Sequence, residues 1–210
     1  MKKSIIVALF CIFGLTEMNA QVSFKPGIRG GLNFSHFTKG DYGYYNDTYY
    51  YDGYGNYVSG SGSNNNFSSK TSFYAGVYGA LKLTKHYTLQ PEIDYSNQGS
   101  NFRLANGSIT KLDVSYLSLA VVNKFTFADK FNIHVGPTID FVVDNNFDTD
   151  NDVDLAFILG AGYNFTKNFG IEARVKKGII PVLDLNNYNG SSSHTNVVFQ
   201  TGITYTFDVK

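Results

Sequence analysis

Charged side chains of both signs recur at alternate positions in stretches that are otherwise apolar or glycine-rich. The set comprises Arg29, Glu92, Asp94, Lys124, Glu172, Arg174 and Lys176. A β-strand sends successive side chains to opposite faces, so within each strand such charges share a face. Charged groups removed from water must pair or change protonation state. The set therefore predicts an internal salt-bridge plug, and a path for protons or ions is the alternative.

The four histidines offer little acid–base chemistry. They are His36, His86, His134 and His194, which we place at a strand end, in a turn, on the charged face and in a loop. A lipid-modifying enzyme would need a nucleophile or acid–base pair near the membrane surface. Ser35 beside His36 and Ser192 near His194 offer such a pair. We interpret these serine and histidine residues as surface polar residues and predict no catalytic residue and no cofactor.

Carboxylates alternate along the segment Asp148–Asp154, a pattern that suits a hard cation such as Ca²⁺. Val153 stands where a calcium loop of the EF-hand type has glycine, and no glutamate closes the segment. We therefore predict a solvated acidic loop and no metal site.

Eight stretches of period-two alternation would position these groups. They span residues 24–34, 73–83, 87–95, 117–127, 131–141, 153–165, 169–179 and 197–207. Three turns, at 83–89, 127–133 and 165–171, repeat an apolar–polar–aromatic–aliphatic pattern at a spacing of roughly 40 residues. Short turns at one end and long loops at the other are typical of a transmembrane β-barrel. The predicted fold is all-β, an eight-stranded antiparallel transmembrane barrel.

Alternation alone does not decide which face points inward. A soluble lipocalin-like ligand-binding barrel would bury the apolar set, but an eight-stranded barrel has too little interior volume for so many large side chains. We therefore expect the apolar face to contact outer-membrane lipid. Seven aromatic residues at the short-turn end predict an interfacial girdle. These are Phe24, Tyr87, Phe127, Phe131, Phe165, Phe169 and Phe207.

Residues 1–20 have the features of a secretory signal peptide, with Lys2 and Lys3 before an apolar run that is too short to anchor the chain. The single cysteine, Cys11, lies inside it, so the mature barrel domain, residues 21–210, would have no thiol chemistry. Of 17 basic and 17 acidic residues, 15 and 16 remain after residue 20. This balance predicts no nucleic-acid partner.

The longest predicted loop, from about Phe37 to Ser69, contains eight tyrosines among glycine, asparagine, aspartate and serine. Tyrosine mixed with small polar residues is a composition that contacts proteins and sugars well. We expect a surface protein or glycan to bind here. A low-complexity outer loop without a partner is the alternative.

Four segments carry a resemblance to a known family. They are Gly27–Ser35, Leu89–Gly99, Tyr116–Phe125 and Val135–Pro137. In these segments the chain resembles the PorT-like group of Bacteroidetes-type outer-membrane β-barrels. The chain departs from that group at Ala120, where the group usually has proline. It also departs from the many outer-membrane barrels that end on an aromatic residue, because Phe207 is followed by three more residues. The resemblance implies location in the bacterial outer membrane and permits a role in secretion or envelope assembly. We predict a non-enzymatic surface barrel, for adhesion or another interaction, with a lipid-modifying enzyme as the alternative.

Overall fold

The computed structural model describes residues 23–38, 49–51, 57–59, 67–104, 107–149, 151–187 and 190–208. The predicted signal peptide, residues 1–20, and most of the tyrosine-rich segment lie outside the described residues. Within the described ranges, no helix is long and apolar enough to cross a membrane.

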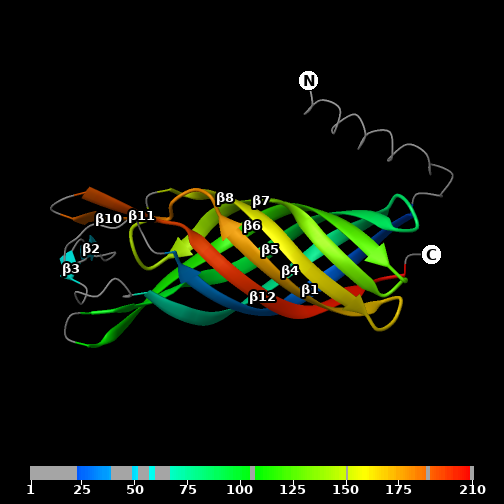
Figure 1. The fold of residues 1–210 in the computed structure, drawn as a ribbon, viewed down its shortest axis with the longest axis horizontal. Helices are drawn as coiled ribbons and strands as arrows, with labels where there is room; N and C mark the ends of the chain where they lie inside the picture. Colours follow the sequence, from blue (N-terminus) through cyan, green and yellow to red (C-terminus); the bar gives the residue numbers. More distant parts are fainter. Residues whose placement is uncertain are drawn as a thin grey trace, which may run out of the picture.

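Eight long strands form a closed antiparallel barrel (Figure 1). The strands are β1 (Ser23–Phe37), β4 (Phe67–Lys82), β5 (Tyr87–Arg103), β6 (Ile109–Phe127), β7 (Phe131–Asn145), β8 (Val153–Asn164), β9 (Phe169–Gly178) and β12 (Asn196–Thr206). Their order around the ring is β1-β12-β9-β8-β7-β6-β5-β4, and β1 closes the ring by pairing with both β12 and β4. The predicted eight-stranded fold is confirmed.

Two small hairpins stand apart from the barrel sheet at the end opposite the C-terminus (Figure 1). One pairs β2 (Tyr49–Tyr51) with β3 (Tyr57–Ser59), and the other pairs β10 (Leu183–Asn187) with β11 (Gly190–His194). The long connections therefore gather at one end, which we call the outer end. The short turns gather at the other end, the turn end.

The three predicted short turns are formed by local hydrogen bonds. The hydroxyl of Thr84 accepts the backbone N–H of Tyr87 at 3.0 Å, and the hydroxyl of Thr166 accepts that of Phe169 at 2.9 Å. In the third turn Ala128 and Asp129 adopt positive φ angles of 49° and 60°, the left-handed conformation that tight hairpins require. Local side-chain chemistry thus fixes the register of the neighbouring strands.

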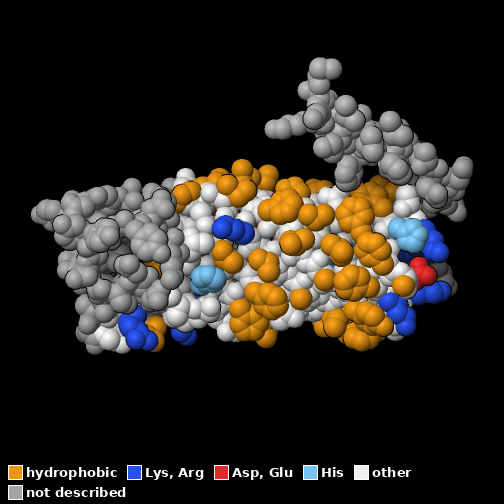
Figure 2. All heavy atoms as spheres, in the orientation of Figure 1, with side chains coloured by type: hydrophobic (Ala, Val, Ile, Leu, Met, Phe, Trp, Pro, Cys, Tyr) orange, Lys and Arg blue, Asp and Glu red, His pale blue; other side chains and the backbone are white. Residues whose placement is uncertain are grey.

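The barrel wall separates an apolar outer surface from a polar interior. Outward residues such as Ile28, Leu159 and Ile203 are 47%, 59% and 56% exposed. Figure 2 shows hydrophobic side chains along much of the visible face, with charged and histidine side chains gathered at the turn end, on the right. The outward positions are even-numbered in β1 and odd-numbered through most of the other barrel strands. The apolar set lies outside, so the lipocalin-like alternative is wrong.

Glycines on the inner face make room for large side chains. Gly31 of β1 is paired with Gly202 of β12, and a Cβ atom on Gly202 would overlap the hydroxyl of Tyr74. A Cβ atom on Gly27 would likewise overlap the ring of Tyr78. Glycine at these positions allows the two tyrosine rings of β4 to lie within a narrow interior.

Replacing Leu159 by arginine tests the orientation of the wall. Leu159 lies six residues from the turn at Phe165, which places it about 15 Å from the turn end of a tilted strand and near the middle of an apolar band about 25 Å tall. We expect Leu159→Arg to lower the free energy of unfolding from lipid vesicles by about 2–4 kcal/mol, measured by urea titration and heat-modifiable gel mobility.

Ile109→Arg is the matched control, because Ile109 is also 59% exposed but begins β6, about 45 Å from the turn end. This variant should lose less than about 1 kcal/mol. Equal losses for the two variants would contradict a lipid-facing wall at Leu159.

Candidate functional site

Four charged side chains form a closed ring of ion pairs inside the barrel. Arg29 of β1 contacts Glu172 at 2.5 Å and Glu92 at 3.1 Å. Arg174 of β9 contacts the same two carboxylates, Glu92 at 2.7 Å and Glu172 at 3.0 Å. All four side chains are 1% exposed or less. Each cation therefore lies between two anions and each anion between two cations.

Neighbouring groups saturate this ring. Asp94 accepts a hydrogen bond from Arg29 at 2.5 Å, and Gln90 donates to Glu92 at 2.7 Å. Tyr74 donates its hydroxyl to Glu172 at 3.1 Å, and its ring centroid lies 4.6 Å from the guanidinium carbon of Arg29. A desolvated ion pair is stable only when such additional hydrogen bonds satisfy the charged atoms. The ring and its partners form a compact polar plug across the lumen.

A second ion pair lies in the lumen on another strand pair. The ammonium of Lys176 contacts Asp140 of β7 at 2.6 Å, and the hydroxyl of Thr138 donates to the same carboxylate at 2.9 Å. The structure therefore pairs six of the seven charges that the sequence assigned to the plug. Asp140 was not in that set, although it shares the inner face of β7 with His134.

Lys124 departs from the predicted plug. Its side chain points inward from β6, and among the described residues it makes no ion pair or hydrogen bond. The adjacent carboxylates, Glu92 and Glu172, are already occupied by Arg29 and Arg174. The sequence predicts the correct face for Lys124 but not that it forms no ion pair among the described residues.

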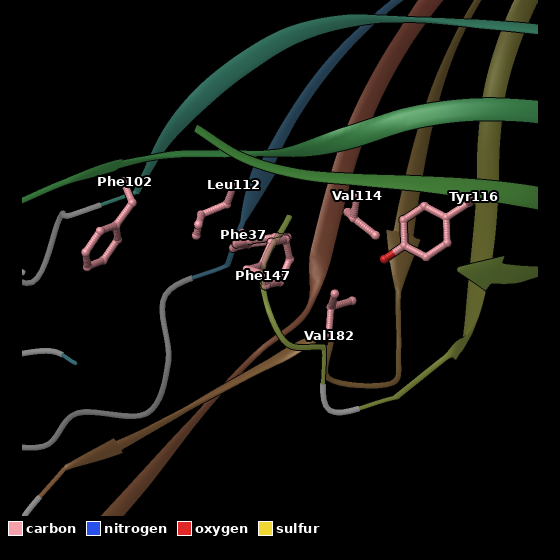
Figure 3. Packing of buried hydrophobic residues seen from close by; sticks show 7 residues of the cluster. All are labelled: Phe37, Phe102, Leu112, Val114, Tyr116, Phe147 and Val182. Carbon is pink, nitrogen blue, oxygen red and sulfur yellow. The ribbon is translucent and has the colours of Figure 1, made fainter. Parts of the chain in front are cut away.

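The outer mouth of the barrel is filled by an apolar cluster that sequence analysis missed. Its members are Phe37, Phe102, Leu112, Val114, Tyr116, Phe147 and Val182 (Figure 3). The ring centroids of Phe37 and Phe147 lie 5.8 Å apart, and Phe67 packs 5.6 Å from Phe37. The signal was present in β6, where Leu112 and Val114 continue the inward positions of Tyr116 and Ser118. A pattern that assigns polar side chains to the inward positions does not predict these two apolar residues.

Ser35 and His36 do not form the pair that an enzyme would need, and the second predicted pair, Ser192 with His194, lies partly outside the described side chains. Ser35 is buried and donates to the carbonyl of Gly99 at 2.8 Å, whereas the next residue, His36, is exposed on the opposite face of β1. His194 is buried, with its Nδ1 atom 2.5 Å from the carbonyl oxygen of Thr38. The side chain of Ser192 lies outside the described residues.

The remaining two histidines have structural contacts. His134 lies beside the ion-pair ring, where its Nδ1 accepts a hydrogen bond from Arg174 at 3.1 Å and its Nε2 lies 2.5 Å from the amide oxygen of Asn132. This arrangement corresponds to the neutral ring with the proton on Nε2. His86 lies in a short turn, with Nδ1 3.1 Å from the carbonyl oxygen of Thr126.

The described carboxylates of the acidic segment do not form a metal-binding group. Asp148 and Asp152 are exposed, whereas Asp154 is buried and accepts the backbone N–H of Ile180 at 3.1 Å. Asp150 lies outside the described residues. In the part of the chain that the structure describes, no three histidine, cysteine, aspartate or glutamate residues are placed to hold a metal ion.

Removing one carboxylate from the ring tests its contribution to stability. Glu92→Ala leaves Arg29 and Arg174 with unbalanced charge in a dry interior, so we expect a loss of about 3–5 kcal/mol in the free energy of unfolding. Urea titration of vesicle-embedded protein measures it. The double variant Glu92→Ala/Arg174→Ala should lose less than the sum of the single variants, because it removes charges of both signs.

Lys25→Ala is the control for this measurement. Lys25 pairs with Asp208 at 2.5 Å at the exposed turn end, with side-chain exposures of 39% and 62%. An exposed pair contributes little, so this variant should unfold close to the wild type. A loss as small for Glu92→Ala would mean that Glu92 is hydrated.

Comparison with known proteins identifies the family to which the barrel is similar and two solved structures with a similar fold. A family model described as an outer membrane protein beta-barrel domain matches residues 19–184. No curated protein matches the sequence. Among solved structures, Neisserial surface protein A is 11% identical with a TM-score of 0.50, and the match covers 90% of this chain and 100% of that one. Outer membrane protein AlkL, solved by solid-state NMR in DMPC bilayers, is 14% identical with a TM-score of 0.51, covering 91% and 94%.

Proposed function

Since the chain belongs to the family of outer membrane protein beta-barrel domains and resides in the bacterial outer membrane, we propose that it is a non-enzymatic closed barrel that presents interaction loops at the cell surface. The observation that carries this proposal is the filled lumen. A transport function would need an aqueous path, and the interior is occupied at two levels.

The two levels differ in chemistry. In the lumen, the ring of Arg29, Glu92, Glu172 and Arg174 is buried and fully paired. At the outer mouth, Phe37, Phe102 and the rest of the apolar cluster pack across the opening. An eight-stranded interior is just wide enough for side chains, so both layers leave little space for a passing solute. What remains for function is the surface of the two ends.

The outer end has the form of a platform for loops. β5 and β6 are 17 and 19 residues long, more than a bilayer requires of a tilted strand. The hairpins β2–β3 and β10–β11 add to this end, with β2 lying beside β10. The apolar cluster beneath them provides a packed base. Binding residues commonly lie on loops that a rigid scaffold holds in place.

The specific role that we propose for the outer end is based on the composition of the tyrosine-rich segment. Tyrosine offers a large, rigid contact area at low entropic cost, which suits a surface protein or a glycan. Adhesion is therefore the role we favour. Membership of the PorT-like group, with a role in secretion or envelope assembly, is a proposal that rests on the sequence resemblance alone. A lipid-modifying enzyme has less support, because Ser35 and His36 lie on opposite faces of β1.

Deleting the tyrosine-rich segment tests the proposed role. Replacing residues 41–65 with a short glycine–serine linker removes β2 and β3 but no strand of the barrel. We expect the variant to fold with normal heat-modifiable gel mobility, because loop-closure entropy changes slowly with length. Adhesion of cells displaying the protein to immobilised glycans and matrix proteins should fall to the level of cells without it.

A full-length variant with the eight tyrosines of this segment replaced by serine is the matched control. It keeps loop length and hydrophilicity, so loss of adhesion in both variants would assign binding to the tyrosines. Undiminished adhesion in both variants would contradict the proposed role of this segment.

Electrical recording tests the closed lumen separately. In planar bilayers the wild-type protein should give no stable conductance of porin size, because the charged ring and the apolar cluster fill the interior. Insertion should be verified on the same sample by protease protection. A steady porin-like current from the inserted protein would contradict the proposal.

A further inference from the structure

The turn end of the barrel opens into a cavity of about 610 Å³ with a strongly basic lining. Six lysines line it: Lys25, Lys82, Lys85, Lys124, Lys130 and Lys167. Among the described residues of the lining, Asp129 is the one carboxylate. Asp208 lies next to the lining and pairs with Lys25, whose hydrogen bond lowers the pKa of Asp208 and keeps that pair ionic at neutral pH. Six cations thus face two anions.

Lys124 forms the inner part of this cavity. It lies between Thr88 and His134 in the strand register, directly on the turn-end side of the ion-pair ring. Among the described residues no carboxylate pairs with it, because Glu92 and Glu172 are engaged by the two arginines. An ammonium group enclosed by a barrel wall is stable only with water or an anion beside it. The cavity supplies the space for one.

The rest of the lining suits a phosphate group. The hydroxyls of Ser23, Thr88 and Thr126 add hydrogen-bond donors to the lysine ammonium groups. Lysine is a common phosphate ligand, acting as a point charge with three donors. Ala80 and Phe165 are the two apolar residues among the lining residues that the structure describes. The volume is that of a pocket for a small molecule.

We propose that this cavity is a binding site for the phosphate groups of a small, water-soluble anion that enters from the periplasm. Gln90 lines the cavity and donates to Glu92 of the ion-pair ring, so the ring lies on the inner side of the cavity and the ligand enters and leaves by the turn end. The barrel wall separates the cavity from the bilayer, which favours a soluble phosphate compound over a lipid headgroup. The proposal concerns the end opposite the interaction loops and does not depend on the proposed surface function.

Pyrophosphate is the probe for this site. We expect titration calorimetry of the full protein in phosphatidylcholine nanodiscs at low salt to show saturable binding with one site per chain. Lys124→Gln should weaken the affinity at least tenfold, because it removes the innermost cation. Lys111→Gln is the matched control, since Lys111 is exposed near the outer end of β6, and it should leave the affinity unchanged.

Lys85→Gln/Lys167→Gln provides a second test that does not touch the interior. Both lysines are exposed in short turns, so this variant should fold normally and bind pyrophosphate several-fold more weakly. This double variant tests the proposal if Lys124→Gln lacks heat-modifiable gel mobility and has therefore not folded. The absence of saturable binding to the wild type, or an equal loss in Lys111→Gln, would overturn the proposal.

Nanodiscs that contain phosphatidylglycerol distinguish a soluble ligand from a lipid. An affinity for pyrophosphate equal to that in phosphatidylcholine supports a soluble ligand. Abolished binding, with phosphatidylglycerol retained on the protein in native mass spectrometry, would assign the cavity to a lipid headgroup and overturn the soluble assignment. Deleting residues 41–65 should not change pyrophosphate binding, so this test and that of the surface function fail independently.

Discussion

The alternating ring of Arg29, Glu92, Arg174 and Glu172 is the constraint on which the interior depends. It joins β1, β5 and β9 through contacts of 2.5–3.1 Å. No two of these three strands are adjacent in the barrel sheet. Charges in a dry interior are tolerated only with complete pairing, so the ring fixes the relative positions of these strands as well as closing the lumen. Tyr74, which donates to Glu172, can enter only because Gly202 leaves space for its hydroxyl. Small residues and buried charges on the inner face are therefore parts of one arrangement.

Most of the fold could be predicted from the sequence, because each strand of a barrel with one apolar and one polar face has alternating apolar and polar residues. The short turns could also be predicted from the sequence, since Thr84 and Thr166 occupy corresponding positions in a repeated pattern. Pairing inside the lumen was not predictable in detail. Alternation assigns Lys124 and Arg174 to the same face, but only the three-dimensional register shows that Arg174 reaches Glu92 and Lys124 does not. The outer cluster was missed because Leu112 and Val114 occupy positions that are polar farther along the lumen.

The plug divides the protein into two ends with different chemistry. The outer end has a packed apolar base, formed by Phe37, Phe102 and their neighbours, beneath long loops. The turn end has exposed lysines around an open cavity. Because the ring between them is fully paired and dry, a ligand at one end has no direct path to the other. The two surfaces therefore differ in chemistry and are separated by a closed section of the lumen.

The distribution of charge also determines which part of the lumen is wet. Glu92 and Glu172 each accept hydrogen bonds from both arginines, and among the described residues neither carboxylate forms an ion pair with Lys124. Lys124, on the turn-end side of the ring, therefore adds a positive charge that forms no ion pair among the described residues. Such a charge would be strongly unfavourable in the dry plug, but it is tolerable where the cavity admits water and counterions. The boundary between dry and hydrated lumen thus lies between Lys124 and the ring, and the hydrated side is the one that attracts anions.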